Sequence, residues 1–190
     1  MFTPEVFGSI VGTHFIEKYK HIHAAHVDIV IHRWTRLTID GKPHPHSFLR
    51  DGTETRNVKV DVTEGKGIEI ASNILGMLLL KSTGAHFWGY IKDEFTTQQD
   101  TYDRILSTEV DATWRWRHFD SLEDVKSDTA RFDNAWTAAR DITIKTFAEH
   151  DSPSVQATMY TMAEKILAAV SEVESVDYAL PNKHYFETGE

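Results

Sequence analysis

The sequence has no cysteine, and this absence removes a large set of functions. Disulfide scaffolds, cysteine zinc sites, iron–sulfur clusters and thiol nucleophiles all require that side chain. Long apolar runs are also lacking, because the longest, Ile74–Leu80, is far shorter than the ~20 residues of a membrane-spanning helix. The first residues do not show the basic and then apolar pattern of a secretory signal. We therefore expect a soluble intracellular protein with no membrane among its partners.

Positive charge is in the minority. The 20 Lys and Arg residues stand against 29 Asp and Glu residues, which gives a formal net charge of −9 with neutral His. Surfaces that bind nucleic acid or anionic membranes need clustered positive charge, so we expect no nucleic-acid partner. A chain of 190 residues with 41% hydrophobic and 26% charged residues is typical of a globular protein with one large or two small domains.

Helical and strand-like periodicities alternate along the chain. Thr3 and Pro4 resemble the N-cap and first residue of a helix that runs to about Tyr19. A second helix could be capped by Asp133, and the clearest helix begins at Ser152-Pro153. Alternation of apolar and polar residues predicts strands at 27–37, 58–62, 68–70, 77–81, 105–118, 175–180 and 184–186.

This order of elements predicts an α+β fold in which helices cover one face of an antiparallel sheet. Residues 66–190 read as a complete β-β-α-α-β-β unit. Residues 1–65 read as the later part of a similar unit whose opening hairpin is missing. We therefore expect two tandem modules, 1–65 and 66–190, of which the first is incomplete.

Histidine is frequent near the N-terminus, at His21, His23, His26, His44 and His46. Imidazole is the commonest metal ligand, and alternate residues of a strand share one side. However, the HExxH pattern does not occur here. We interpret these residues as hydrogen-bonding loop or interface histidines and predict no metal site, with a metal-binding protein as the alternative.

The motifs of common cofactor enzymes do not occur. Gly65-Lys66-Gly67 has neither the third glycine nor the following helix of a dinucleotide fingerprint, and no G-x-S-x-G elbow is present. The pair Trp114 and Trp116 is typical of core packing rather than of a cofactor site. We therefore expect no cofactor.

One set of residues has complementary chemistry. Phe87 could stack on a flat heterocycle, and the Arg104 guanidinium could make a two-pronged contact to anionic oxygen or nitrogen. The amide of Gln156 could pair with a lactam edge. Gln156 also stands in the first turn of a predicted helix, whose N–H groups attract anions. Together these groups suit a planar, anionic, purine-like oxo acid, although the sequence alone does not show that they meet.

Long stretches of the chain resemble the urate oxidase (uricase) family. They are Phe7–Tyr19, His21–Val27, His32–Arg36, Leu79–Phe87 with Tyr90, Phe95 and Arg104, Ser154–Tyr160, and Leu180–Phe186. The resemblance implies a fold of tandem T-fold modules and a homotetramer around a tunnel. It also implies oxidation of urate by O₂ to 5-hydroxyisourate with release of H₂O₂, without metal or organic cofactor.

The resemblance assigns roles to individual residues. It implies that Phe87 stacks on urate and that Arg104 and Gln156 grip two edges of the ring. The Val155 backbone N–H contributes from the helix N-terminus. Asn182 would hold O₂ or the peroxide-site water above the ring, and His184 would belong to a proton relay.

Parts of the family pattern have no counterpart in this sequence. In the family, a Lys and a Thr from the N-terminal portion of the neighbouring subunit complete the proton relay. We expect this chain to be truncated at both ends and to lack that pair, the opening hairpin and the peroxisomal Ser-Lys-Leu tail. The alternative function is therefore a catalytically impaired purine-binding or structural T-fold oligomer. The expected location is peroxisomal by resemblance and otherwise cytoplasmic.

Overall fold

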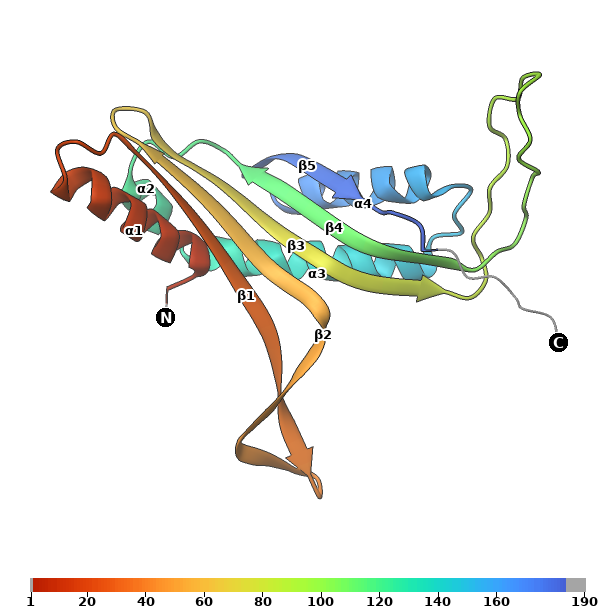
Figure 1. The fold of residues 1–190 in the computed structure, drawn as a ribbon, viewed down its shortest axis with the longest axis horizontal. Helices are drawn as coiled ribbons and strands as arrows, with labels where there is room; N and C mark the ends of the chain where they lie inside the picture. The colour runs from red at the N-terminus through yellow and green to blue at the C-terminus, as the bar shows by residue number, and fades with distance from the viewer. Residues whose placement is uncertain (1, 184–190) are drawn as a thin grey trace.

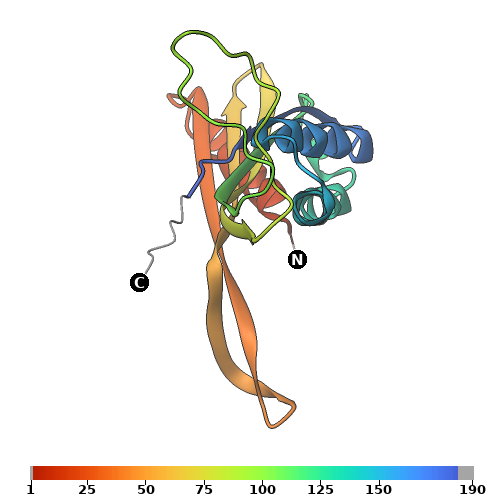
Figure 2. The same cartoon turned by 90° about the vertical axis from the view of Figure 1, so that its right-hand side faces the viewer.

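A computed structural model describes residues 2–183 of the chain. It contains a five-stranded antiparallel sheet whose spatial order follows the chain, formed by β1 (Ala24–Ile39), β2 (Lys42–Thr63), β3 (Gly67–Lys81), β4 (Leu106–Trp116) and β5 (Val173–Ala179). The helices are α1 (Pro4–Lys18), α2 (Leu122–Lys126), α3 (Ala130–Glu149) and α4 (Val155–Ala169). The long helices lie on one side of the sheet (Figures 1 and 2), which confirms the predicted α+β class.

Helix α1 starts where the sequence predicts. The Thr3 hydroxyl accepts from the Val6 N–H, and Pro4 occupies the first helical position, where a missing N–H costs nothing. The helix packs closely on β2 because it presents glycine there. A Cβ atom at Gly12 would stand 2.6 Å from Val62 Cγ2. Close approach therefore depends on the absence of a side chain at this position.

The core lies between the helices and the sheet. Val58 and Val60 of β2 are fully buried, while Lys59 between them is exposed, so the predicted alternation holds. Trp114 and Trp116 are buried on the same side, and the Trp116 ring meets Phe132 of α3 edge-on at 4.7 Å between centroids. The tryptophan pair therefore serves packing, as its spacing predicted.

Two predicted strands are one strand in the structure. Residues 68–70 and 77–81 both belong to β3, whose pairing with β4 shifts between Ile74 and Met77. Gly76 sits in that irregularity with φ +70°, a conformation that favours glycine. The sequence signal was split because the bulge interrupts the alternation.

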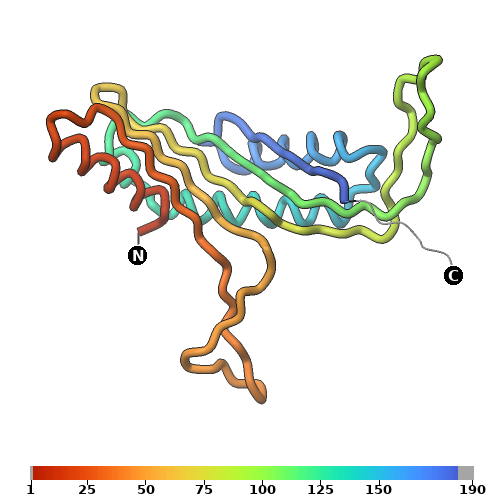
Figure 3. Tube along the Cα trace, in the orientation of Figure 1, coloured from red at the N-terminus to blue at the C-terminus, as the bar shows by residue number. Residues whose placement is uncertain are grey.

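The hairpin of β1 and β2 is much longer than predicted. Only residues Thr55–Thr63 of β2 also pair with β3. Beyond the His32–Thr55 pair, residues 33–53 form a two-stranded ribbon. We call this segment the β1–β2 arm. Figures 1 and 3 show it leaving the sheet, and none of its residues is buried.

Two helix starts differ from the prediction. Helix α3 begins at Ala130 after Thr129, so Asp133 lies in its first turn and does not cap it. Asp133 instead accepts a 2.6 Å bond from Arg56. Helix α4 begins at Val155 and is capped by Ser154, two residues beyond the predicted Ser152. The predicted last strand, 184–186, lies outside the described residues.

The expected division at residue 65 falls in the turn between β2 and β3. These strands pair from Thr55–Leu75 to Thr63–Gly67, so one continuous sheet crosses that position. The assignment of 1–65 and 66–190 to separate modules stays a prediction.

Candidate active site

The connection between β3 and β4, residues 82–105, carries two of the predicted site residues. It projects from the end of the sheet near the start of α4 (Figure 1). Phe87 is fixed by a backbone pair with Thr101: the Phe87 N–H donates over 2.7 Å to Thr101 O, and the Thr101 N–H donates back over 2.9 Å. The two sides of the loop are therefore joined at the proposed stacking residue.

Arg104 lies beside that ring. Its guanidinium carbon is 5.4 Å from the centroid of the Phe87 ring, so residues well separated in sequence are in contact range. The side chain is half-buried, and Arg104 Nε is buried without a hydrogen-bond acceptor among residues 2–183. A half-buried guanidinium with an unused N–H is suited to an anionic ligand.

Asp103 closes the base of the loop. Its carboxylate accepts from the Thr83 hydroxyl at 2.8 and 2.9 Å and from the Gly84 N–H at 3.0 Å. The hydrogen bond from Thr83 and then that from Gly84 hold the pKa of Asp103 below its ordinary value. The ionised carboxylate therefore keeps the chain on either side of the loop together, next to Arg104.

The N-terminus of α4 supplies unused N–H groups. Ser154 caps the helix by accepting from the Ala157 N–H at 3.2 Å. The first N–H groups of a helix have no intrahelical acceptor, and within the described chain nothing accepts from those of Val155 and Gln156. The Gln156 side chain is exposed, whereas Val155 packs against a small cluster that includes the buried Ala85.

A short bridge joins the Phe87 loop to this helix start. The His86 N–H donates over 2.8 Å to Ser152 O, and Ala85 pairs with Ser152 in a parallel bridge. The His86 ring nitrogen Nε2 also lies 2.8 Å from Asp151 Oδ1. Phe87 and the backbone N–H groups of Val155 and Gln156 are thus held on one hydrogen-bonded unit.

The segment after β5 reaches the same region. Asn182 pairs with Thr108 in an antiparallel bridge, and the Lys183 N–H donates over 2.7 Å to Ser107 O. Asn182 therefore lies beside the start of β4, a few residues from Arg104. His184, the remaining predicted site residue, lies outside the described residues.

Two of the N-terminal histidines, His23 and His26, have acidic neighbours in or just after the facing strand β2. His23 Nδ1 lies 2.6 Å from Glu64 Oε2, and His26 Nδ1 is bonded to Asp61. The imidazole of His44 instead meets that of His46 edge-on at 4.7 Å. Across residues 2–183 there is no group of three or more His, Asp or Glu side chains arranged to hold a metal ion.

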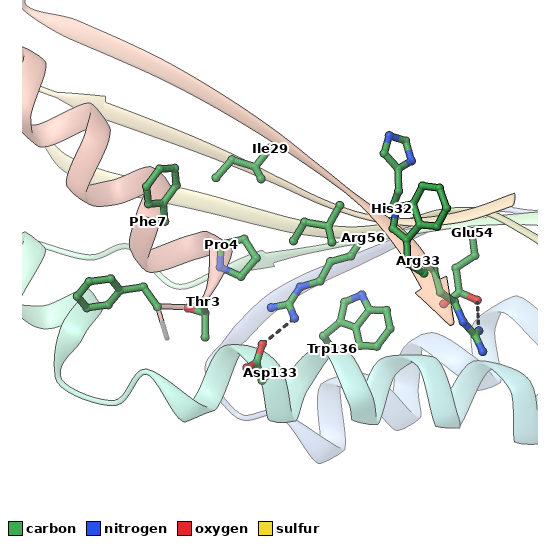
Figure 4. A pocket seen from close by; sticks show the side chains of 13 residues that line it. Thr3, Pro4, Phe7, Ile29, His32, Arg33, Glu54, Arg56, Asp133 and Trp136 are labelled. Atoms are coloured by element: carbon green, nitrogen blue, oxygen red, sulfur yellow. Dashed lines mark hydrogen bonds and ion pairs between the residues drawn. The ribbon is translucent and has the colours of Figure 1, made fainter. Parts of the chain in front are cut away.

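A cavity of about 610 Å³ lies elsewhere, between α1, β1, β2 and α3 (Figure 4). Its apolar lining includes Phe7, Trp34 and Trp136. The charged groups beside it pair with each other, as Arg56 does with Asp133. Sequence reasoning missed this cavity, because four separate elements contribute its walls and no motif marks it.

Comparison with known proteins gives the family. The uricase family model matches residues 9–61 and 70–189. The chain belongs to the uricase family. Its sheet with helices on one face is the uricase T-fold. None of the helices in the described part is long and apolar enough to cross a membrane.

Individual uricases are similar over nearly the whole chain. The uricase of Aspergillus flavus is 65% identical over 184 residues, which cover 97% of this chain and 61% of that protein. The uricase of Emericella nidulans is 63% identical over the same shares. A crystal structure of uricase from Arthrobacter globiformis is 34% identical with a TM-score of 0.84, covering 98% of this chain and 60% of that one. The chain thus spans about three fifths of the length of these uricases.

Proposed function

We propose that this chain forms the substrate-binding part of a urate oxidase, which oxidises urate with O₂ to 5-hydroxyisourate and releases H₂O₂. Membership of the uricase family supports the reaction. The observation that carries the proposal is the joining of the Phe87–Arg104 pair to the start of α4 through the His86–Ser152 bond. The groups that suit a planar anion thereby belong to one local unit.

Each residue has a physical role in binding. The Phe87 ring offers a stacking surface to the purine, and Arg104 offers its unused Nε–H to an anionic edge. The Val155 N–H and the positive end of α4 add a donor and a favourable potential. The Gln156 amide donates and accepts, so it matches a lactam edge of urate.

The reaction balances without a further oxidant. Urate loses two electrons to O₂, which takes up two protons and leaves as H₂O₂, while water adds as a hydroxyl group at ring carbon C5. Arg104 and the α4 dipole favour deprotonated urate, which is a better electron donor. The substrate therefore supplies the electrons, and we propose that no cofactor is needed. Asn182 would hold O₂ or water above the ring, and His184 would relay protons.

We also propose a homotetramer in the peroxisome. Assembly is supported by large apolar side chains that are exposed on two segments of the single chain, because exposed apolar surface commonly marks an interface. These side chains lie on the β1–β2 arm and on the loop 82–105, and include Trp34, Ile39, Leu49, Trp88, Ile91 and Phe95. The peroxisomal location rests on the family resemblance.

The test is urate consumption, followed in the ultraviolet, with coupled detection of H₂O₂ on metal-stripped protein. Turnover that yields one H₂O₂ per urate supports the proposal. Saturable binding of a non-oxidisable urate analogue without turnover would favour the purine-binding alternative, in which the Lys–Thr relay is lacking. Absence of both turnover and binding would contradict the proposed site.

A further inference from the structure

Phe87 is one half of a stacked pair of rings. The Tyr90 ring lies nearly parallel to it, with 4.6 Å between centroids and 17° between planes. Both residues are half-buried. Such an arrangement is favourable beyond simple burial, so the two rings restrict each other's orientation.

Tyr90 is itself held from the opposite side of the loop. Its hydroxyl donates over 2.6 Å to Gln98 O. Lys92 Nζ lies 5.3 Å from the Tyr90 ring centroid and 2.7 Å from Asp100 Oδ2. The Tyr90 ring is therefore held by a hydrogen bond at its hydroxyl and has a cation near its ring.

A ring can stack on two partners, one on each face. Because Tyr90 takes one face of Phe87, a planar ligand can stack on Phe87 only at the other face. We propose that Tyr90 is a positioning residue that fixes the plane of Phe87 and directs the purine to the face away from Tyr90. This inference rests on the proposed role of Phe87 in binding urate.

In the opposite arrangement, removal of the Tyr90 ring would change the affinity for the ligand in the opposite direction. If Tyr90 occupied the face that the ligand needs, the ligand would have to displace it, and removing the Tyr90 ring would tighten binding. If Tyr90 supports Phe87 from behind, removing its ring frees Phe87 to rotate and weakens binding. The direction of the change in affinity therefore decides between them.

The experiment is calorimetric titration with a non-oxidisable urate analogue. We expect Tyr90→Ala to weaken binding up to about tenfold, in line with the strength of an aromatic pair. Tyr90→Phe keeps the ring and is expected to stay within about threefold of the unaltered chain. Tyr90→Leu keeps the bulk of the side chain without a ring. It should weaken binding as Tyr90→Ala does, and it replaces Tyr90→Ala in the test if that variant folds poorly.

Tyr102→Ala is the matched control, because Tyr102 is an exposed tyrosine of the same loop with no stacked ring in the described part of the chain. Its affinity is expected to be unchanged. Unchanged or tighter binding by both Tyr90→Ala and Tyr90→Leu would overturn the inference. If the unaltered chain does not bind the analogue, the proposed function fails first, and this inference falls with it.

Discussion

Arg56 and Arg104 are both largely removed from solvent, but their surroundings differ. Arg56 donates to the fully buried Glu5 at 3.0 and 3.2 Å and to Asp133 at 2.6 Å, beside the cavity in Figure 4. Arg104 has no carboxylate partner among the described residues. The Nε of both arginines is buried without an acceptor there, so the two differ in the carboxylates that surround their terminal nitrogens. A buried charge must be compensated, so the first arginine is already committed to the fold, whereas the second can serve an anionic ligand.

The two regions also differ in cavity volume and in how their charges are paired. The cavity of about 610 Å³ has aromatic walls, yet its charged groups neutralise each other. The Phe87 region has donors without an acceptor among residues 2–183, from Arg104 and from the start of α4. The cavity also has buried donors without an acceptor in the described chain, Arg56 Nε and Trp136 Nε1. What distinguishes the Phe87 region is a guanidinium with no carboxylate partner there, close to helix N–H groups that can bind an anion.

The largest expected effect is on stability, from Arg56→Met. This substitution leaves the Glu5 carboxylate, which is 0% exposed, with the Ser72 hydroxyl at 2.8 Å as its one hydrogen-bond donor among the described residues. Loss of one partner of a buried ion pair costs about 3–5 kcal/mol. We expect a loss of that size in the free energy of unfolding, measured by urea denaturation, with unchanged analogue affinity of the folded fraction.

Arg115→Met is the control for that change. Arg115 is exposed, and its contact to Asp177 is 3.9 Å long. Exposed pairs contribute about 0–1 kcal/mol, so its unfolding free energy should hardly change. An equal loss in both variants, or weaker analogue binding by folded Arg56→Met protein, would break the distinction between the two regions.

The second largest expected effect is on the affinity for the urate analogue, from Arg104→Ala. Charge-assisted hydrogen bonds contribute about 1.5–3 kcal/mol, so we expect analogue affinity to fall about 10- to 100-fold in calorimetry, with little change in unfolding free energy. Arg104→Lys keeps the charge but loses the planar guanidinium. Its analogue affinity should lie between those of the unaltered chain and of Arg104→Ala.

Arg33→Ala is the matched control in the other region. Arg33 lines the cavity in Figure 4 and contacts Glu54 at 3.6 Å. We expect it to bind the analogue like the unaltered chain. Equal losses from Arg33→Ala and Arg104→Ala would mean that Arg104 has no special role.

The smallest expected effect is a loss of local stability at the base of the loop 82–105 in acid. The folded pKa of Asp103 is lowered by Thr83 and Gly84, so its stabilising contribution is present above the ordinary value and is lost as the pH falls through the folded value. Below about pH 4, we expect the Gly84 amide to exchange faster with solvent, relative to the buried β2 amide of Val58, in hydrogen-exchange NMR. Asp103→Asn should show the fast exchange at every pH, and an acid dependence that survives this substitution would contradict the assignment.

Much of the fold follows from local sequence signals. Thr3 and Pro4 predicted the start of α1, and alternation around Val58–Val62 predicted a strand. The predictions that differ from the structure do so because of tertiary contacts. The bulge at Gly76 split one strand into two, and the ribbon of the β1–β2 arm extends beyond any partner in the sheet. Asp133 looked like a cap but pairs with Arg56, which arrives from a distant strand.

The site was only partly accessible from sequence. The chemistry of Phe87, Arg104 and Gln156 suggested a purine pocket, and the family resemblance added Val155, Asn182 and His184. The contact of Phe87 with Arg104 and the bond from His86 to Ser152 depend on how the loop folds back onto α4. The stacking of Tyr90 on Phe87 likewise needs the loop conformation, because aromatic residues at that spacing carry no motif of their own.

The most direct test of the central claim is an amide NMR titration of the chain with a non-oxidisable urate analogue. The account predicts that the largest shift changes fall on Phe87, Arg104, Val155 and Gln156, while the amides of Phe7, Trp34 and Trp136 around the cavity stay in place. Changes centred on the cavity residues, or saturable binding that leaves the Val155 and Gln156 amides unmoved, would contradict it.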